Sequence, residues 1–234
     1  MRVSGTILAN VYIDGFNLYY AALAKSPYKW LDLDSLSSKL LPNRSIKRIR
    51  YFTARVTGPS AQRQDTYLRA LGTLPKISIH EGTFLQHTVL APVADKPHKS
   101  ASAVLEYLDW TGNWIALPRP HPGRPMRVSA RRSEEKASDV NLATYLLLDA
   151  MNHDSDESFV ISGDSDLVMP IDVTTKILRV PVRVFNPKPN RPSAELQAVA
   201  ASYYTLPAKL LPACILPQTI TDKAGRTITK PPTW

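Results

Sequence analysis

The chain has 234 residues, of which 44% are hydrophobic, so it is long enough to bury the core of one domain with an elaboration or a small appendage. Its single cysteine, Cys214, excludes an internal disulfide framework and a cysteine-based zinc site, and no apolar run approaches the roughly 18 residues that span a bilayer, so we expect a cytoplasmic protein without a membrane partner. The formal net charge of +9 favours a polyanionic partner, although a basic surface can also serve solubility alone.

Strand and helix patterns alternate in the N-terminal part of the chain. The β-forming residues 7–13 predict a buried strand that runs directly into the turn signal Asp14-Gly15. The spacing of apolar residues then predicts a helix that ends before Pro27, a short helix from Leu33 to Leu40, a strand over 47–56, a helix over 60–72 and a strand around 77–79. This order is typical of an α/β fold.

Residues 86–133 interrupt the alternation. They contain six prolines, the tryptophans Trp110 and Trp114, and a basic run from Arg119 to Arg132. So long an interval exceeds the usual connection between two elements, which predicts a functional insertion or a mobile loop.

Regular structure is expected again from residue 138. The patterns predict a helix over 138–152, a strand over 158–162, a helix to about 177, a strand over 180–185 and a helix over 193–204. Alternating strands and helices predict a three-layer α/β/α fold, in which helices cover both faces of a parallel sheet. We therefore expect a domain at residues 1–205, and at 206–234 an extended proline-rich tail that wraps the domain or hangs free.

Aspartates stand at predicted strand ends and at one helix start. Asp14 and Asp164 directly follow apolar strands, and in an open α/β sheet the sites form beyond the carboxyl ends of the strands. Asp139 lies in the first turn of the helix over 138–152, on a stripe with apolar residues. Converging carboxylates repel one another and need a counter-charge, usually a divalent cation. The pattern therefore predicts a metal site for phosphodiester chemistry.

Each acid also has a purely structural alternative. Asp14-Gly15 is a common turn signal, and Asp139 could compensate the helix dipole with Ser138 as the N-cap. Asp164 or Asp166 could cap the following helix, but one cap needs only one of them. The Asp-Ser-Asp spacing thus supplies more carboxylates than capping requires.

Three separated motifs resemble the signature of NYN domains, which belong to the PIN-like nuclease superfamily. They are residues 12–18 (YIDGFNL), 135–143 (EKASDVNLA) and 161–167 (ISGDSDL). The resemblance covers about residues 7–205 and implies a parallel sheet of order 3-2-1-4-5, in which the first and fourth strands are neighbours. It also implies a ribonuclease that depends on Mg²⁺ or Mn²⁺.

The resemblance assigns roles to single residues. The acidic metal-binding and catalytic positions of the family fall on Asp14, Asp139 and Asp164. A recurrent acid of the last motif, expected to support catalysis, falls on Asp166. Polar positions that would contact substrate, phosphate or the metal shell fall on Asn17, Lys136 and Asn141.

Basic and aromatic residues of the long interval suggest how a polyanion would bind. The edge of the groove that binds the polyanion would be lined by Arg119, Arg124, Arg127, Arg131 and Arg132. Trp110 and Trp114 would either stack on unpaired bases or pack inside a small subdomain. The expected partner is single-stranded RNA. Three further basic residues are expected to be solvated side chains at the start of a strand, without a binding role: Lys47, Arg48 and Arg50.

These patterns favour a metal-dependent endoribonuclease in which the cation polarises the phosphate and activates a water molecule. Two alternatives stay open: an RNA-binding module without turnover, and a phosphohydrolase of small phosphoesters. Against the second, Phe16 stands where aspartyl-phosphate chemistry would need a second aspartate, two residues after Asp14. The sequence leaves a homo-oligomer open.

Overall fold

The computed structural model describes the backbone of residues 6–92, 106–108, 114–116, 127–232 and 234. The chain divides into two compact units, one formed by Met1–Phe84 with Glu135–Trp234 and the other by Leu85–Glu134. Within the described residues, no helix is both long and apolar enough to cross a bilayer.

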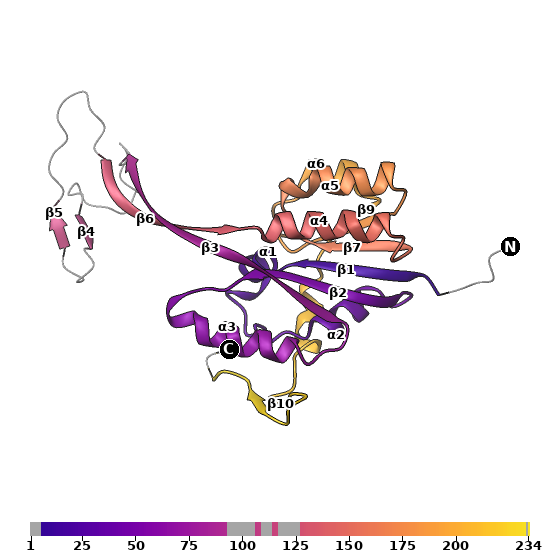
Figure 1. The fold of residues 1–234 in the computed structure, drawn as a ribbon, viewed down its shortest axis with the longest axis horizontal. Helices are drawn as coiled ribbons and strands as arrows, with labels where there is room; N and C mark the ends of the chain where they lie inside the picture. Colours follow the sequence, from indigo (N-terminus) through magenta and orange to yellow (C-terminus); the bar gives the residue numbers. More distant parts are fainter. Residues whose placement is uncertain (1–5, 93–105, 109–113, 117–126, 233) are drawn as a thin grey trace. The chain divides into compact units, whose positions relative to one another are not determined.

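A seven-stranded sheet of order β6-β3-β2-β1-β7-β8-β9 runs through the fold (Figure 1). Parallel pairing joins β3 to β2, β2 to β1, β1 to β7, β7 to β8 and β8 to β9. The strands are β1 (Leu8–Asp14), β2 (Ser45–Ala54), β3 (Ile77–Pro92), β6 (Arg127–Lys136), β7 (Glu157–Ile161), β8 (Val182–Asn186) and β9 (Ser202–Thr205). The predicted order 3-2-1-4-5 is confirmed by the central run β3-β2-β1-β7-β8.

Helices cover both faces of this sheet, so the predicted α/β architecture is confirmed (Figure 1). One face carries α1 (Gly15–Leu18), the π-helical turn η1 (Tyr19–Leu23), α2 (Leu33–Leu40) and α3 (Ala61–Leu71). The other carries α4 (Ser138–Met151), η3 (Ser165–Leu167), α5 (Val168–Asp172), the π-helical turn η4 (Val173–Ile177) and α6 (Ala194–Val199). The central strand β1 is buried from Ala9 to Asp14, as expected for a strand packed on both faces.

Two stretches contain more β structure than the sequence predicted. The helix expected over 193–204 ends at Val199, where Ala200 has an extended backbone, and Ser202–Thr205 forms the edge strand β9. Two tyrosines and a threonine in that segment favour a strand over a helix. The long interval also begins and ends in strands, since β3 continues to Pro92 and β6 starts at Arg127. Within the second unit, β4 (Glu106–Leu108) pairs antiparallel with β5 (Trp114–Ala116).

The C-terminal segment packs against the face that carries α2 and α3. It contains the short 3-10 helix η5 (Ala208–Ala213) and the hairpin of β10 (Thr219–Thr221) and β11 (Thr227–Thr229). The indole nitrogen of Trp30 donates to the carbonyl oxygen of Pro217 over 2.9 Å. Buried side chains add this segment to the core at Leu206, Leu211, Cys214, Leu216 and Ile228.

A buried ion pair joins β2 to α4. Arg50 donates from Nε and Nη2 to the two carboxylate oxygens of Asp149, each over 2.7 Å, and the Tyr12 hydroxyl donates to the same carboxylate over 2.8 Å. The guanidinium lies 4.2 Å from the ring centroid of Tyr145. The side chains of Arg50 and Asp149 are only 9% and 7% exposed. The expectation of a solvated strand start is therefore wrong for Arg50, and Lys47 and Arg48 pair with Asp154.

Candidate active site

Asp14 ends β1 and is held by hydrogen bonds at both carboxylate oxygens. Oδ1 accepts from the backbone nitrogen of Asn17 over 2.9 Å, which caps α1, and Oδ2 accepts from the hydroxyl of Ser162 over 2.8 Å. The residue is only 6% exposed. Asp14 therefore stabilises the turn, as the structural alternative expected, and also lies at the carboxyl end of the sheet. Its two hydrogen bonds fix the orientation of the carboxylate.

The turn after β7 is locked to the turn after β1. The side-chain oxygen of Asn17 accepts from the backbone nitrogen of Gly163 over 3.1 Å, and the Ser162 hydroxyl oxygen accepts from the backbone nitrogen of Asp164 over 3.1 Å. A Cβ on Gly163 would collide with the side chain of Asn186 at the end of β8, so this position requires glycine. Three neighbouring strands thus fix the backbone that carries the acids.

Asp164 and Asp166 lie on the short helix start that follows. Asp164 precedes η3 and accepts from the backbone nitrogen of Asp166 over 3.1 Å through Oδ1. The Asp164 residue is half-buried, whereas Asp166 is exposed. The capping alternative therefore holds for Asp164, and Asp166 is left as a solvent-facing carboxylate at the same turn.

Asp139 lies in the first turn of α4, behind a strained residue. Ala137 precedes the helix with a φ of 79°, a left-handed conformation that is costly for a residue with a Cβ. The alternative with Ser138 as the N-cap does not hold, because Ser138 is already the first helical residue and Ala137 is the N-cap, without a side-chain hydrogen bond. The backbone nitrogen of Ser138 donates to Glu135 Oε1 over 3.1 Å. A Cβ on Gly82 of β3 would strike this turn, so the approach of β3 restricts the path into the helix.

Electrostatic coupling ties five acids into one site, which we call the acid cluster: Asp14, Glu135, Asp139, Asp164 and Asp166. Burial first, and then the charges of the other four acids, together raise the pKa of Asp139 to about 7. Burial also raises the pKa of Asp14, against the hydrogen bonds from Asn17 and Ser162, and the charges of Asp164 and Glu135 add to this. The structure thus brings the predicted aspartates within mutual electrostatic reach.

Glu135 is the member of the cluster that the sequence reasoning missed. It lies at the end of β6 and acts on both Asp14 and Asp139 through its charge. The available signal was its position in the second motif, four residues before Asp139, but only aspartates were considered. The pairing of β6 at the sheet edge, which brings Glu135 to the site, was not predicted.

The other predicted residues fall in different surroundings. Asn17 is buried, and its side chain accepts the hydrogen bond that joins the turn after β1 to the turn after β7. Lys136 is exposed at the end of β6. Asn141 is half-buried on α4, two positions after Asp139, a spacing that does not share a helix face. Several predictions lie outside the described residues: those on Trp110, Arg119 and Arg124, and those on the side chains of Trp114, Arg127, Arg131 and Arg132.

The donor chemistry of the acid cluster fits a hard divalent cation. All five side chains offer carboxylate oxygens, the ligands that Mg²⁺ and Mn²⁺ prefer. Burial and the neighbouring carboxylates both raise the pKa values of Asp14 and Asp139, and a bound cation would favour their charged forms. Within the described part of the chain, no three acidic, histidine or cysteine side chains stand in metal-binding geometry. Mg²⁺ bound through one or two carboxylates and several waters does not need such a group.

The raised pKa of Asp139 predicts how the metal-free protein responds to pH. Because the pKa is about 7 in the fold and 3.8 ordinarily, the folded state binds more protons between about pH 4 and 7. The free energy of unfolding should therefore fall as the pH rises through this range. At about pH 8 the wild-type carboxyl is charged, so Asp139→Asn should raise the free energy of unfolding. The expected gain is on the order of 1–2 kcal/mol, after a discount for the partial exposure of the side chain.

Urea denaturation of the metal-free proteins at about pH 4 and about pH 8 measures this effect. The gain should be small at the lower pH, where the wild-type carboxyl is protonated in the folded state and partly protonated in the unfolded state. Glu195→Gln is the matched control, because Glu195 is an exposed acid in the first turn of α6 outside the acid cluster, and its substitution should change stability by less than about 0.5 kcal/mol. A loss of stability in Asp139→Asn at about pH 8 would contradict the assigned electrostatics.

The comparisons with known proteins agree with this architecture. The NYN domain family matches residues 9–207, and the chain belongs to this family of the PIN-like nuclease superfamily. The protein is 27% identical over 261 residues to the 6-hydroxy-3-succinoylpyridine 3-monooxygenase HspA of Pseudomonas putida (strain DSM 28022 / S16), with 99% of this chain and 76% of that protein covered.

A solved structure shares the fold. The crystal structure of VPA0982, a protein of unknown function from Vibrio parahaemolyticus RIMD 2210633, superposes with a TM-score of 0.52. The two chains are 14% identical, and the match covers 88% of this chain and 97% of the other. At this identity the likeness concerns the fold alone.

Proposed function

We propose that the protein is an endoribonuclease that hydrolyses single-stranded RNA with a divalent cation, Mg²⁺ or Mn²⁺, held by the acid cluster. The observation that carries this proposal is the grouping of Asp139 with four other acids at the carboxyl end of the sheet, where burial and their charges together raise its pKa to about 7. Membership in a family of nucleases supports hydrolytic chemistry at such a site. The net charge of +9 suits a polyanionic substrate.

The side chains of the acid cluster would have different roles in binding the cation. Asp14, Asp139 and Asp164 would hold the cation, one or two of them directly and the rest through water, and the bound cation would polarise the scissile phosphate and lower the pKa of an attacking water. The hydrogen bonds from Ser162 and Asn17 keep Asp14 in one orientation before substrate arrives. In the metal-free protein Asp139 has a pKa of about 7, so binding of the cation to its carboxylate near neutral pH would release a proton.

A second candidate function follows from one similarity. HspA, which is named as a monooxygenase of 6-hydroxy-3-succinoylpyridine, aligns with 99% of this chain. A monooxygenase consumes O2 and two electrons for each product. Oxygen uptake that depends on this compound, in the presence of a reductant, would favour that activity. The acid cluster favours the nuclease, because redox chemistry at a pyridine does not require five grouped carboxylates.

Cleavage of a labelled single-stranded RNA tests the nuclease proposal. We expect products only with Mg²⁺ or Mn²⁺, loss of cleavage with a chelator, and recovery when the cation is restored. The products should carry a 5′-phosphate and a 3′-hydroxyl, as in-line attack by water gives when the 3′ oxygen is the leaving group. Tight RNA binding without cleavage under either cation would favour the binding module instead, and cleavage of small phosphoesters alone would favour the phosphohydrolase.

A further inference from the structure

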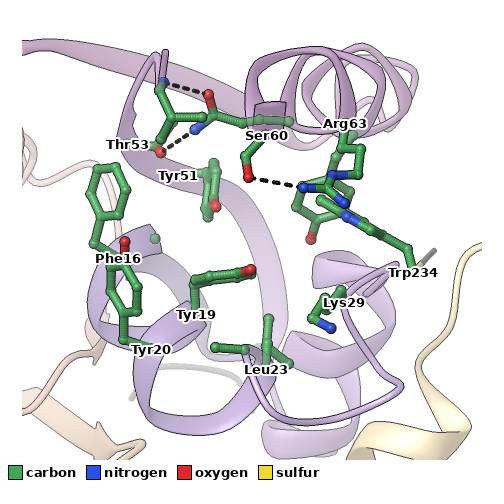
Figure 2. Close-up of a pocket in the computed structure, with 15 residues that line it drawn as sticks. Phe16, Tyr19, Tyr20, Leu23, Lys29, Tyr51, Thr53, Ser60, Arg63 and Trp234 are labelled. Carbon is green, nitrogen blue, oxygen red and sulfur yellow. Dashed lines mark hydrogen bonds between the residues drawn. The ribbon is translucent and has the colours of Figure 1, made fainter. Parts of the chain in front are cut away.

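A pocket of about 430 Å³ lies between η1 and α3 on the face of the sheet that carries these helices (Figure 2). This volume falls in the range of small-ligand sites. Of its fifteen lining residues, all within the described part of the chain, none is acidic. Six are aromatic: Phe16, Tyr19, Tyr20, Tyr51, Tyr67 and Trp234.

The pocket adjoins the acid cluster through the turn after β1. Gly15 lines the pocket and follows Asp14 directly in the chain. A Cβ on Gly15 would lie 2.7 Å from the ring and hydroxyl of Tyr51, so this ring lies against the turn. Burial raises the pKa of the Tyr51 phenol, and the charge of Asp14 raises it further. A ligand in the pocket would therefore lie beside the turn that carries Asp14.

One wall of the pocket presents a largely exposed aromatic ring, that of Tyr20. The chain leaves α1 after a single turn and continues as the π-helical turn η1, a rare conformation that is frequent at functional sites. This places Tyr20 on the outside, 69% exposed. Its ring stacks on Phe16 at 6.1 Å between centroids and 17° between planes. A planar ligand could continue this stack.

The opposite end of the pocket carries positive charge. Figure 2 shows Lys29 and Arg63 near Trp234, while Phe16 and Tyr20 lie across the pocket from them. Arg63 donates to the hydroxyl of Ser60 over 3.0 Å, which holds its guanidinium at the rim. The lining thus combines aromatic faces at one end with cations at the other, the complement of a planar base attached to a phosphate.

We propose that this pocket binds the base of an unpaired ribonucleotide of the RNA substrate, stacked on the Phe16–Tyr20 pair. This inference rests on the proposed function. A nucleotide within a polymer carries a phosphate on each side. One phosphate would reach Lys29 and Arg63, and the other would pass the turn at Asp14 toward the acid cluster. A small aromatic acid has only one anionic group and would leave one of these two sites unused.

Binding titrations without cleavage test the proposal. With a chelator present, so that RNA stays intact, calorimetry gives the affinities of 5′-AMP and of a short single-stranded oligoadenylate. Loss of one stacked base should weaken binding by about 5- to 100-fold, so we expect this loss in Tyr20→Ala. Tyr20→Phe should bind like the wild type, because it retains the stacking face. Tyr204→Ala is the matched control, an exposed aromatic outside the pocket at 46% exposure.

Unchanged affinity of both probes in Tyr20→Ala would overturn the proposal. Tighter binding of nicotinate, a small aromatic acid, than of 5′-AMP would also overturn it. The failure of this inference and that of the proposed function are distinguishable. If the wild type cleaves RNA with Mn²⁺ and Tyr20→Ala binds RNA normally, the pocket assignment is wrong and the nuclease stands. If 5′-AMP binding depends on Tyr20 but RNA is never cleaved, the nucleotide pocket stands and the nuclease does not.

Discussion

Asp14→Asn should abolish Mn²⁺-dependent cleavage of single-stranded RNA while the fold stays intact. The loss of a group that merely supports a metal ligand costs about 10- to 100-fold, so the loss of a ligand should cost about 100-fold or more. The asparagine keeps an oxygen to accept from the backbone nitrogen of Asn17, and its amide can face the hydroxyl of Ser162. Because burial raises the pKa of Asp14, removal of this charge should leave the metal-free protein at least as stable.

The comparison needs a folded variant and a clean preparation. Both proteins should be purified identically, so that a contaminating ribonuclease would appear in both. Thermal unfolding should give the variant a Tm equal to or above that of the wild type without metal. Cleavage by Asp14→Asn at the wild-type rate would remove this residue from the site, and an unfolded variant would contradict the structural part of the prediction.

Asp149→Asn, unlike Asp14→Asn, should lower the stability of the protein strongly, and this loss does not arise from the acid cluster. Asp149 is also an aspartate of α4, but its carboxylate pairs with Arg50 and accepts from Tyr12. Both members of the pair are nearly buried, at 9% and 7% exposure. Removal of one partner leaves a buried charge without compensation, which costs about 3–5 kcal/mol.

Urea denaturation at neutral pH measures this cost. The matched control is Asp65→Asn, which breaks an ion pair with Arg55 that is about half exposed on each side. Such exposed pairs contribute about 0–1 kcal/mol. If Asp149→Asn were no more costly than Asp65→Asn, the buried network would not hold β2 to α4 as described.

The strands and the positions of the acids at their ends were accessible from sequence because their signals are local. An apolar run that ends in Asp14 or just before Asp164 predicts both a strand and the edge at which its acid lies. The resemblance to NYN domains then placed these two strands side by side, as β1 and β7 are. The helix stripe likewise predicted that Asp139 is partly buried.

What escaped prediction depends on contacts between distant segments. Glu135 joins the acid cluster only because β6 pairs at the sheet edge and a strained turn at Ala137 leads from it into α4. Arg50 looked like a solvated strand residue because its partner lies 99 positions away. The aromatic pocket also combines residues from opposite ends of the chain, with Phe16 and Trp234 among its lining residues. Periodicity within a window cannot register such pairings.

The most direct test of the acid cluster as a metal site is a crystal soaked in Mn²⁺ and measured for anomalous scattering. We expect a peak coordinated by carboxylate oxygens from among Asp14, Asp139 and Asp164, and no such peak in Asp14→Asn crystals. Mn²⁺ density only elsewhere in the wild type, or none at a concentration that supports RNA cleavage, would show that the acid cluster is not the metal site.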